Sequence, residues 1–219
     1  MRTLIVNCKN YPEVLGEGAV SLARAVSRVA EDGEVRAIIA PPTPFLGLVA
    51  SKTGATVYSQ DVDAVVGDKT TGATLPDAVR GAGATGTILN HSESKKAFGI
   101  LSDLVPRLRG LEVCLCAGTS AEAAKLSKLG PTYVAIEPPE LIGTGVAVSK
   151  ARPSLVTDTI TAVRDAGYRG RVLCGAGIVT GADVKKAVEL GAEGVLVASS
   201  VVKAPDWNAK VRELADSLM

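Results

Sequence analysis

The sequence predicts an α/β protein in which eight parallel strands close into a (β/α)8 barrel ringed by helices. Eight short apolar runs, rich in β-branched residues, alternate with segments of helical periodicity along the 219 residues. The runs are continuous rather than alternating in polarity, as in strands that are buried on both faces of a parallel sheet. Eight such units favour a closed barrel over an open doubly wound sheet, which usually has about five or six strands.

The first four strand–helix units fill the amino-terminal half of the chain. Strands are predicted from "TLIVNCK", "VRAIIAPP", "TVYSQD" and "GTILNHS", at residues 3–9, 35–42, 56–61 and 86–92, because each has an apolar centre. The intervening segments repeat apolar residues at helical spacing, which predicts helices at residues 18–33, 43–54, 75–83 and 93–110. Glycine ends these helices, as in "KTGATVYSQ", where it supplies the left-handed C-terminal cap.

The last four units repeat the same pattern. Strands are predicted from "EVCLCAG", "YVAIEPP", "RVLCGAG" and "GVLVASS", at residues 112–118, 133–139, 171–177 and 194–200. Helices are predicted at residues 120–130, 153–167, 181–191 and 206–219. The chain is shorter than the roughly 250 residues typical of such barrels, so some helices must be shortened, most obviously between Cys116 and Tyr133. No linker divides the repeat, so residues 1–219 are expected to form one domain.

Composition excludes several classes of protein. With 24 basic and 23 acidic side chains, the net charge of +1 gives no general attraction to nucleic acid or anionic membranes, so any anion site must be local. No run reaches the roughly 18 apolar residues that span a bilayer, and the amino terminus turns polar too early for a signal peptide, which predicts a cytoplasmic protein. The four cysteines lie in apolar runs without zinc-site spacing and are expected to be buried thiols.

One glycine motif is discounted on its position. Residues 81–86, "GAGATG", match the GxGxxG pattern of dinucleotide binding. That motif needs a strand before it and a helix after it, so that the pyrophosphate meets a helix N-terminus. Here a helix precedes the motif and a strand follows it, so no nucleotide is expected there.

Polar residues stand where three of the apolar runs end, which is where parallel barrels carry their chemistry. The first strand ends at Asn7 and Lys9, the fourth at His91 and Glu93, and the sixth at Glu137; His91 is the only histidine of the chain. Taken alone, each has an ordinary explanation as a solvated lysine, a structural histidine or a capping carboxylate. Together they place an amide, an ammonium, an imidazole and carboxylates around one rim.

Small residues at the last strand ends indicate an anion site. They occur at residues 175–177, "GAG", and 198–200, "ASS", and in the loop segment 142–145, "IGTG". Loops after strands 7 and 8 form the recurring phosphate site of this fold, although such glycines also serve simple tight turns. A carboxylate base, an imidazole and an ammonium beside a phosphate anchor suit proton abstraction next to a carbonyl, under a loop that closes and excludes water.

Three motifs carry a resemblance to a known family. "NCKNY" (residues 7–11) is similar to its Asn-x-Lys segment, "NHSE" (residues 90–93) to its Gly-His-Ser-Glu, and "IEPPELIGTG" (residues 136–145) to its Glu-Pro-loop-Gly-Thr-Gly. Along essentially its whole length, the chain resembles the triosephosphate isomerase family in the shorter form typical of archaea. The resemblance implies a TIM barrel that interconverts dihydroxyacetone phosphate and D-glyceraldehyde 3-phosphate in glycolysis and gluconeogenesis, without metal or cofactor.

The resemblance also implies residue roles. Glu137 corresponds to the base and His91 to the neutral electrophile, while Lys9 stabilises developing charge and Asn7 helps to position it. Glu93 is implied as a supporting residue that links to Lys9. Backbone N–H groups for the phosphate are implied at Ile142, Gly143, Gly177, Ala198 and Ser199. A helix expected to start at Ser92 and Glu93 favours the neutral imidazole through its positive end.

The chain departs from the longer members at several positions. Residues 139–141 replace a segment with a tryptophan, Gly177 replaces a serine, residues 198–199 replace a glycine pair, and Ser94 replaces an arginine. These changes bear on the kinetics of the loop and on the phosphate contacts, and they remove no catalytic group.

Two further expectations concern partners and alternatives. Residues 70–74, "TTGAT", resemble the loop that enters a neighbouring subunit in this family, with Thr74 at the interface, and trimmed helices favour a homotetramer over a dimer. The alternatives are another phosphate-binding barrel, such as a sugar-phosphate epimerase or an enzyme of tryptophan biosynthesis, and a non-catalytic scaffold. Neither alternative explains the three motifs together.

Overall fold

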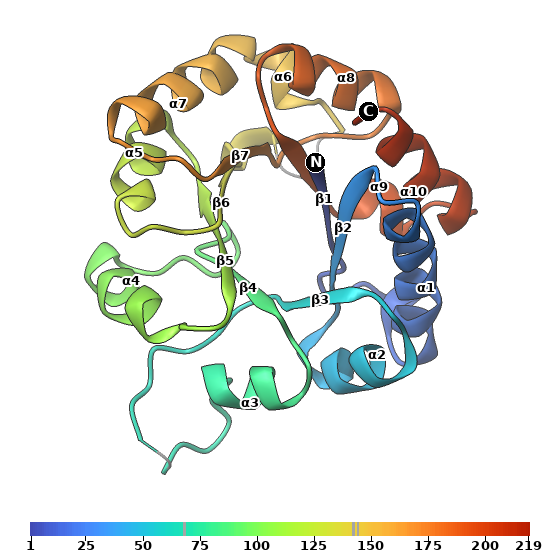
Figure 1. Ribbon diagram of the computed structural model, residues 1–219, viewed down its shortest axis with the longest axis vertical. Coiled ribbons are helices and arrows are strands. Elements are labelled where there is room, and N and C mark those ends of the chain that lie inside the picture. The colour runs from blue at the N-terminus through green and yellow to red at the C-terminus, as the bar shows by residue number, and fades with distance from the viewer. Residues whose placement is uncertain (68, 142, 144) are drawn as a thin grey trace.

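The computed structural model describes residues 1–67, 69–141, 143 and 145–219, and it contains a closed barrel of eight strands (Figure 1). The strands pair in sequence order, and β8 pairs with β1, where Thr3 faces Gly194. Every pair is parallel, which confirms the predicted (β/α)8 fold. The strands are β1 (Arg2–Asn7), β2 (Val35–Ala40), β3 (Thr56–Ser59), β4 (Gly86–Leu89), β5 (Glu112–Ala117), β6 (Tyr133–Ile136), β7 (Arg171–Cys174) and β8 (Gly194–Val197).

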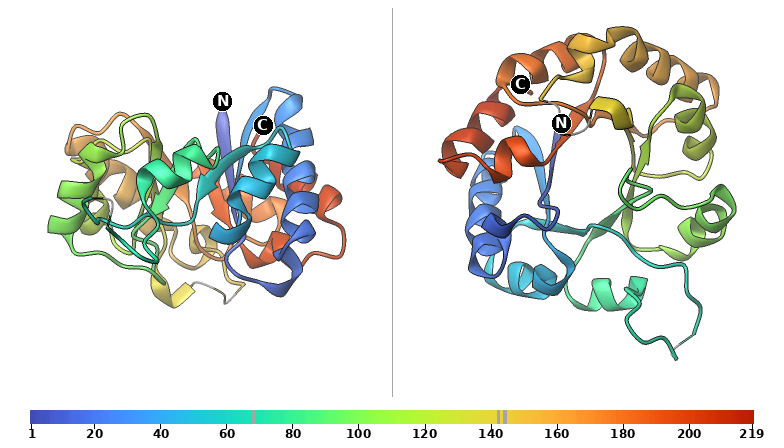
Figure 2. Two further views of the ribbon diagram at one scale, coloured as in Figure 1. Left: turned by 90° about the horizontal axis from the view of Figure 1, so that it is seen from below. Right: turned by 180° about the vertical axis from the view of Figure 1, so that it is seen from behind.

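A ring of helices covers the outside of the barrel (Figures 1 and 2). The ring consists of α1 (Glu17–Glu31), α2 (Leu46–Lys52), α3 (Pro76–Gly81), α4 (Phe98–Leu104), α5 (Ser120–Ser127), α7 (Pro153–Asp165), α8 (Gly181–Glu189) and α10 (Trp207–Asp216). Several are short, as predicted: α3 has six residues and α5 has eight. Two further helices, α6 (Val148–Ala151) and α9 (Ser199–Val202), lie in the loops after β6 and β8, where the sequence predicted no helix.

The predicted helix at residues 93–110 is wrong at its start, because α4 begins only at Phe98. Side-chain hydrogen bonds occupy the preceding residues instead: the Lys96 N–H donates to Asn90 Oδ1 (3.0 Å), and Lys96 Nζ binds Asp61 Oδ2 (2.6 Å). Such bonds compete with helix formation. The strand predicted at residues 194–200 is likewise too long, since it ends at Val197 and a helix begins at Ser199.

The apolar core has two layers, one between the strands and the helices and one inside the barrel. The inner layer consists of Ile5, Ile38, Ala40, Tyr58, Ile88, Cys114, Cys116, Tyr133, Ala135, Leu173 and Leu196. These side chains fill the barrel, so a ligand site has to lie at its rim rather than in a pore. All four cysteines are buried and free, as predicted. The discounted glycine motif runs from the end of α3 to the start of β4, in the order opposite to that of a nucleotide site.

The strands share one direction, so their carboxyl ends meet at one end of the barrel. In the side view of Figure 2 the amino terminus lies at the top, and the loop that follows β6, drawn in yellow, projects at the bottom. The carboxyl-terminal end therefore gathers the loops in which the sequence placed its candidate residues.

Candidate active site

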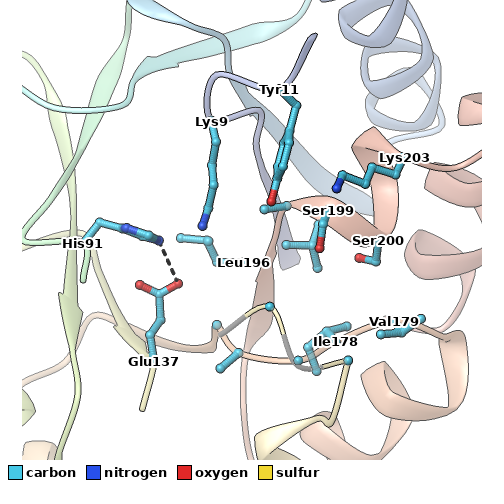
Figure 3. A pocket seen from close by; sticks show the side chains of 17 residues that line it. Lys9, Tyr11, His91, Glu137, Ile178, Val179, Leu196, Ser199, Ser200 and Lys203 are labelled. Carbon is cyan, nitrogen blue, oxygen red and sulfur yellow. Dashed lines mark ion pairs between the residues drawn. The ribbon is translucent and has the colours of Figure 1, made fainter. Parts of the chain in front are cut away.

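A cavity of about 370 Å³ opens at the carboxyl ends of the strands (Figure 3). Its volume suits a small molecule. It is lined by Lys9, Tyr11, His91, Glu137, Gly143, Gly145, Gly175, Ala176, Gly177, Ile178, Val179, Leu196, Val197, Ala198, Ser199, Ser200 and Lys203. Three residues that the sequence assigned to catalysis, from three different strands, therefore share one cavity with the predicted phosphate-binding residues that the structure describes.

Glu137 follows β6 and points into this cavity (Figure 3). Its side chain is only 2% exposed. Burial raises the pKa of the Glu137 carboxyl above its ordinary value, and the neighbouring His91, Cys116 thiol and Lys9 act in the opposite direction without outweighing it. Glu137 Oε2 is buried and accepts no hydrogen bond within the described part of the chain. A buried carboxylate with a free oxygen and a raised pKa is suited to accept a proton.

His91 faces Glu137 across the cavity, with Nε2 lying 3.9 Å from Glu137 Oε1 (Figure 3). The separation is too long for a hydrogen bond. On the other side of the ring, Nδ1 accepts the backbone N–H of Glu93 at 3.2 Å. With Nδ1 as the acceptor of this bond, Nε2 is the ring nitrogen that faces Glu137. The helix expected to start at Ser92 begins only at Phe98, so the neutral imidazole stays a prediction.

Lys9 enters the site from the end of β1, and Asn7, two residues earlier, lies outside the lining of this cavity. Lys9 adopts a left-handed φ of 47°, and its N–H donates to Asn7 Oδ1 at 3.0 Å, so the buried Asn7 amide stabilises this turn. Gln60 Nε2 donates to the Lys9 carbonyl at 2.9 Å and holds the turn from the side of β3. Lys9 Nζ lies 2.7 Å from Glu93 Oε1, which is the link expected between these two side chains.

Asn90 anchors the loop that carries His91. Its φ is 60°, and its Nδ2 donates to the Cys116 carbonyl (2.9 Å) and to Glu122 Oε1 (3.0 Å). The Lys96 N–H donates to its Oδ1. Asparagine tolerates left-handed backbone better than most residues do, and here its side chain also ties the loop after β4 to β5 and α5. These hydrogen bonds attach the loop to β5 and to α5 and also join Asn90 to Lys96 within the loop.

The predicted phosphate-binding residues line the same cavity, with one exception. Gly143, Gly177, Ala198 and Ser199 all contribute to the lining, whereas Ile142 lies outside the described residues. Gly177 has a φ of 70°, and a Cβ atom there would meet the Val146 carbonyl oxygen at 1.8 Å. Only glycine fits, because the segment that leads from the loop after β6 into α6 packs directly against it.

Several lining residues were not predicted. Tyr11 was part of a quoted motif but received no role, Ser200 was noted only as a small residue of the anion site, and Lys203 was left unassigned. Lys203 was missed because no helix was predicted directly after β8. That helix brings residue i+4, here Lys203, to the same face as Ser199. Gly175 was noted only as a small residue, but a Cβ there would lie 2.4 Å from Glu137 Cγ.

Together, the fold and the site define an enzyme of the (β/α)8-barrel class with acid–base groups at the carboxyl ends of its strands. A family model described as triosephosphate isomerase matches residues 2–214. A triosephosphate isomerase of Cenarchaeum symbiosum (strain A) is 46% identical over 217 residues, covering 98% of this chain and 97% of the relative. One of Caldivirga maquilingensis is 44% identical over 218 residues, covering 99% and 97%. The chain belongs to the triosephosphate isomerase family, as its motifs predicted.

Proposed function

We propose that this protein interconverts dihydroxyacetone phosphate and D-glyceraldehyde 3-phosphate through an enediolate, as a step of glycolysis and gluconeogenesis without metal or cofactor. One observation carries the proposal: Glu137 Oε1 and His91 Nε2 face each other at 3.9 Å in a cavity that Lys9 also lines. A base for carbon and a neutral donor for oxygen on opposite sides of a small ligand suit proton transfer between adjacent carbons.

The proposed residue roles are supported by this geometry. Glu137 moves the proton between the two carbons, and its raised pKa brings its basicity closer to that needed to take a proton from carbon. His91 Nε2–H donates to the two oxygens in turn. The Lys9 ammonium stabilises the negative charge of the enediolate, Asn7 fixes the turn that presents it, and Glu93 holds both Lys9 and His91.

The phosphate group of the substrate occupies the opposite end of the cavity. Backbone N–H groups of Gly143, Gly177, Ala198 and Ser199 are proposed to bind it, which needs no net charge on the protein. The same role for Ile142 is proposed from the sequence alone. Closure of the loop after β6 over the ligand would exclude water from the enediolate.

The test is the rate of triose phosphate interconversion by the wild type beside Glu137→Gln and His91→Gln, without added metal or cofactor. Losses on the order of 10²-fold or more in kcat are expected for both variants, because each removes one proton-transfer group. Circular dichroism establishes that the variants are folded. A folded wild type that converts neither triose phosphate would overturn the proposal.

The other phosphate-binding barrels, a sugar-phosphate epimerase or an enzyme of tryptophan biosynthesis, are not favoured, since the family match covers residues 2–214. A non-catalytic scaffold is not favoured for the same reason. Hydrogen exchange separates the scaffold from the isomerase: phosphoglycolate should protect the amide of Gly143 in an isomerase, and protection at that loop should be absent in a scaffold.

We further propose a homo-oligomer, with a tetramer favoured over a dimer and the loop around Thr74 at an interface. The Asp63 N–H donates to the Thr74 carbonyl at 2.8 Å and the Thr74 N–H to Asp63 Oδ2 at 2.7 Å, which closes the base of a loop that extends from the barrel (Figure 1). Val66 on this loop is 79% exposed. Exposure of this apolar side chain supports the proposal that another subunit covers the loop in an assembly. Light scattering at micromolar protein tests this, and a sharp monomer mass would contradict it.

Residues 1–219 are proposed to form one domain that acts in the cytoplasm on a small phosphorylated triose, without nucleic acid or membrane partners. No described helix is long and apolar enough to cross a membrane. A single cooperative thermal transition, with equal calorimetric and van't Hoff enthalpies, is expected of one domain. Two resolved transitions would contradict this part.

A further inference from the structure

Lys203 is a second cation at the cavity, and it lies outside the three motifs that carry the family resemblance. It follows α9, and it lines the cavity together with Ser199 and Ser200 of that helix. Figure 3 shows its side chain extending toward the same space as Tyr11 and Ser199, on the side of the cavity away from His91 and Glu137. Its position therefore corresponds to the phosphate end rather than the proton-transfer end.

The Lys203 ammonium is held by an aromatic ring. Its Nζ lies 4.8 Å from the centroid of the Tyr11 ring, within the range of cation–π contacts. Tyr11 follows the turn that presents Lys9. One short segment therefore carries both the Lys9 cation and the aromatic ring that positions the Lys203 cation. The two cations differ in their partners: Lys9 is paired with Glu93, whereas in the described part of the chain no carboxylate forms an ion pair with Lys203.

The charges of the cavity make this difference matter. Glu137 contributes a carboxylate, and the charge of Lys9 is offset by Glu93, so these three residues carry a net charge of −1 and repel a dianion. Lys203 adds the positive charge that is not offset. We propose that Lys203, positioned by the Tyr11 ring, binds the dianionic phosphate group of the substrate; the proposal rests on the proposed function.

The test compares Lys203→Met and Lys203→Arg with the wild type and with Lys125→Met. Lys125 is a matched control, because its Nζ lies 4.1 Å from the Phe98 ring outside this cavity. Two quantities are measured for each protein: the Kd of inorganic phosphate by isothermal titration calorimetry, and kcat and KM for glyceraldehyde 3-phosphate. The first does not depend on any catalytic activity.

Lys203→Met is expected to raise both the Kd of phosphate and KM on the order of 10-fold and to leave kcat within about 2-fold, because it removes one charge near a dianion. Lys203→Arg should recover most of the affinity, and Lys125→Met should match the wild type. Tyr11→Leu should weaken phosphate binding a few-fold and Tyr11→Phe should not, since only the ring positions the ammonium.

Two results overturn the proposal: an unchanged Kd and KM in Lys203→Met, or a loss in Lys203→Arg as large as that in Lys203→Met. An inactive wild type whose phosphate affinity still depends on the charge of residue 203 would refute the proposed function and support the anion site. Loss of folding in Lys203→Met is recognised by its circular dichroism, and the comparison of Tyr11→Leu with Tyr11→Phe then decides.

Discussion

Gly175→Ala should displace the proposed base without disturbing the backbone that carries it. A Cβ at residue 175 would lie 2.4 Å from Glu137 Cγ and 2.9 Å from Glu137 Oε1, about 1 Å short of ordinary van der Waals contact. Gly175 does not have a positive φ, so alanine adds no backbone strain there. The contact is relieved by a shift of the Glu137 side chain by about 1 Å, and a misplacement of that size costs about 10²-fold in rate.

The assay is the initial rate of triose phosphate interconversion at saturating substrate, together with thermal unfolding. We expect kcat to fall about 100-fold, and the free energy of unfolding to fall by about 1–3 kcal/mol from overpacking. Gly81→Ala is the control, because a Cβ there meets no atom within 4 Å, and it should keep kcat within about 2-fold. A folded Gly175→Ala variant with kcat within about 3-fold of the wild type would refute the argument that Gly175 positions Glu137.

Three further changes test the energetics of the structure. Because burial raises the pKa of Glu137, stability falls as the pH rises through that pKa, so Glu137→Gln should raise the Tm at pH 7 by at least about 2 °C in calorimetry, with no gain below about pH 4. Burial raises the pKa of Asp183, but Lys150 and backbone N–H groups lower it by more, so the pKa is below its ordinary value. Asp183→Asn should therefore reduce the free energy of unfolding by about 1–2 kcal/mol in urea at pH 7, and this loss should vanish as the pH falls through the lowered pKa. Asn90→Gly should lose about 1–3 kcal/mol of unfolding free energy with its three hydrogen bonds, and Asn90→Ala about 1 kcal/mol more from left-handed strain; equal losses would contradict the strain argument.

The strands were predictable because buried parallel strands leave a local signal, an apolar run, in the sequence. The start of α4 at Phe98, rather than at residue 93, could not be predicted. Asp61 binds Lys96 from 35 residues away, and no local pattern shows that contact. Helix α4 gives way to a 3-10 turn that contains Pro106, which has no backbone N–H to continue the α-helical hydrogen bonds; this proline is a local signal that the prediction passed over.

Part of the lining of the cavity could be predicted from the sequence, whereas the environment of each side chain could not. Asn7, Lys9, His91 and Glu137 stand at or directly after the carboxyl ends of strands. Because all strands run in the same direction, these ends meet at one end of the barrel. The orientation of the His91 ring depends on one backbone N–H, and the raised pKa of Glu137 depends on burial; both are properties of packing rather than of residue order. The roles of these residues stay predictions until the variants are measured.

The two ends of the cavity are built on supports of different kinds. Glu137 directly follows β6, and its N–H is bonded to the carbonyl of Ala117 on β5, so the proton-transfer end is fixed to the wall of the barrel. Gly143, Gly177, Ser199 and Lys203 belong to the loops after β6, β7 and β8 or to the short helix that follows β8. The proposed ligand recognition can therefore be redesigned by exchanging those loops for others that fit a different anionic group, while Glu137 keeps its place on an unchanged barrel.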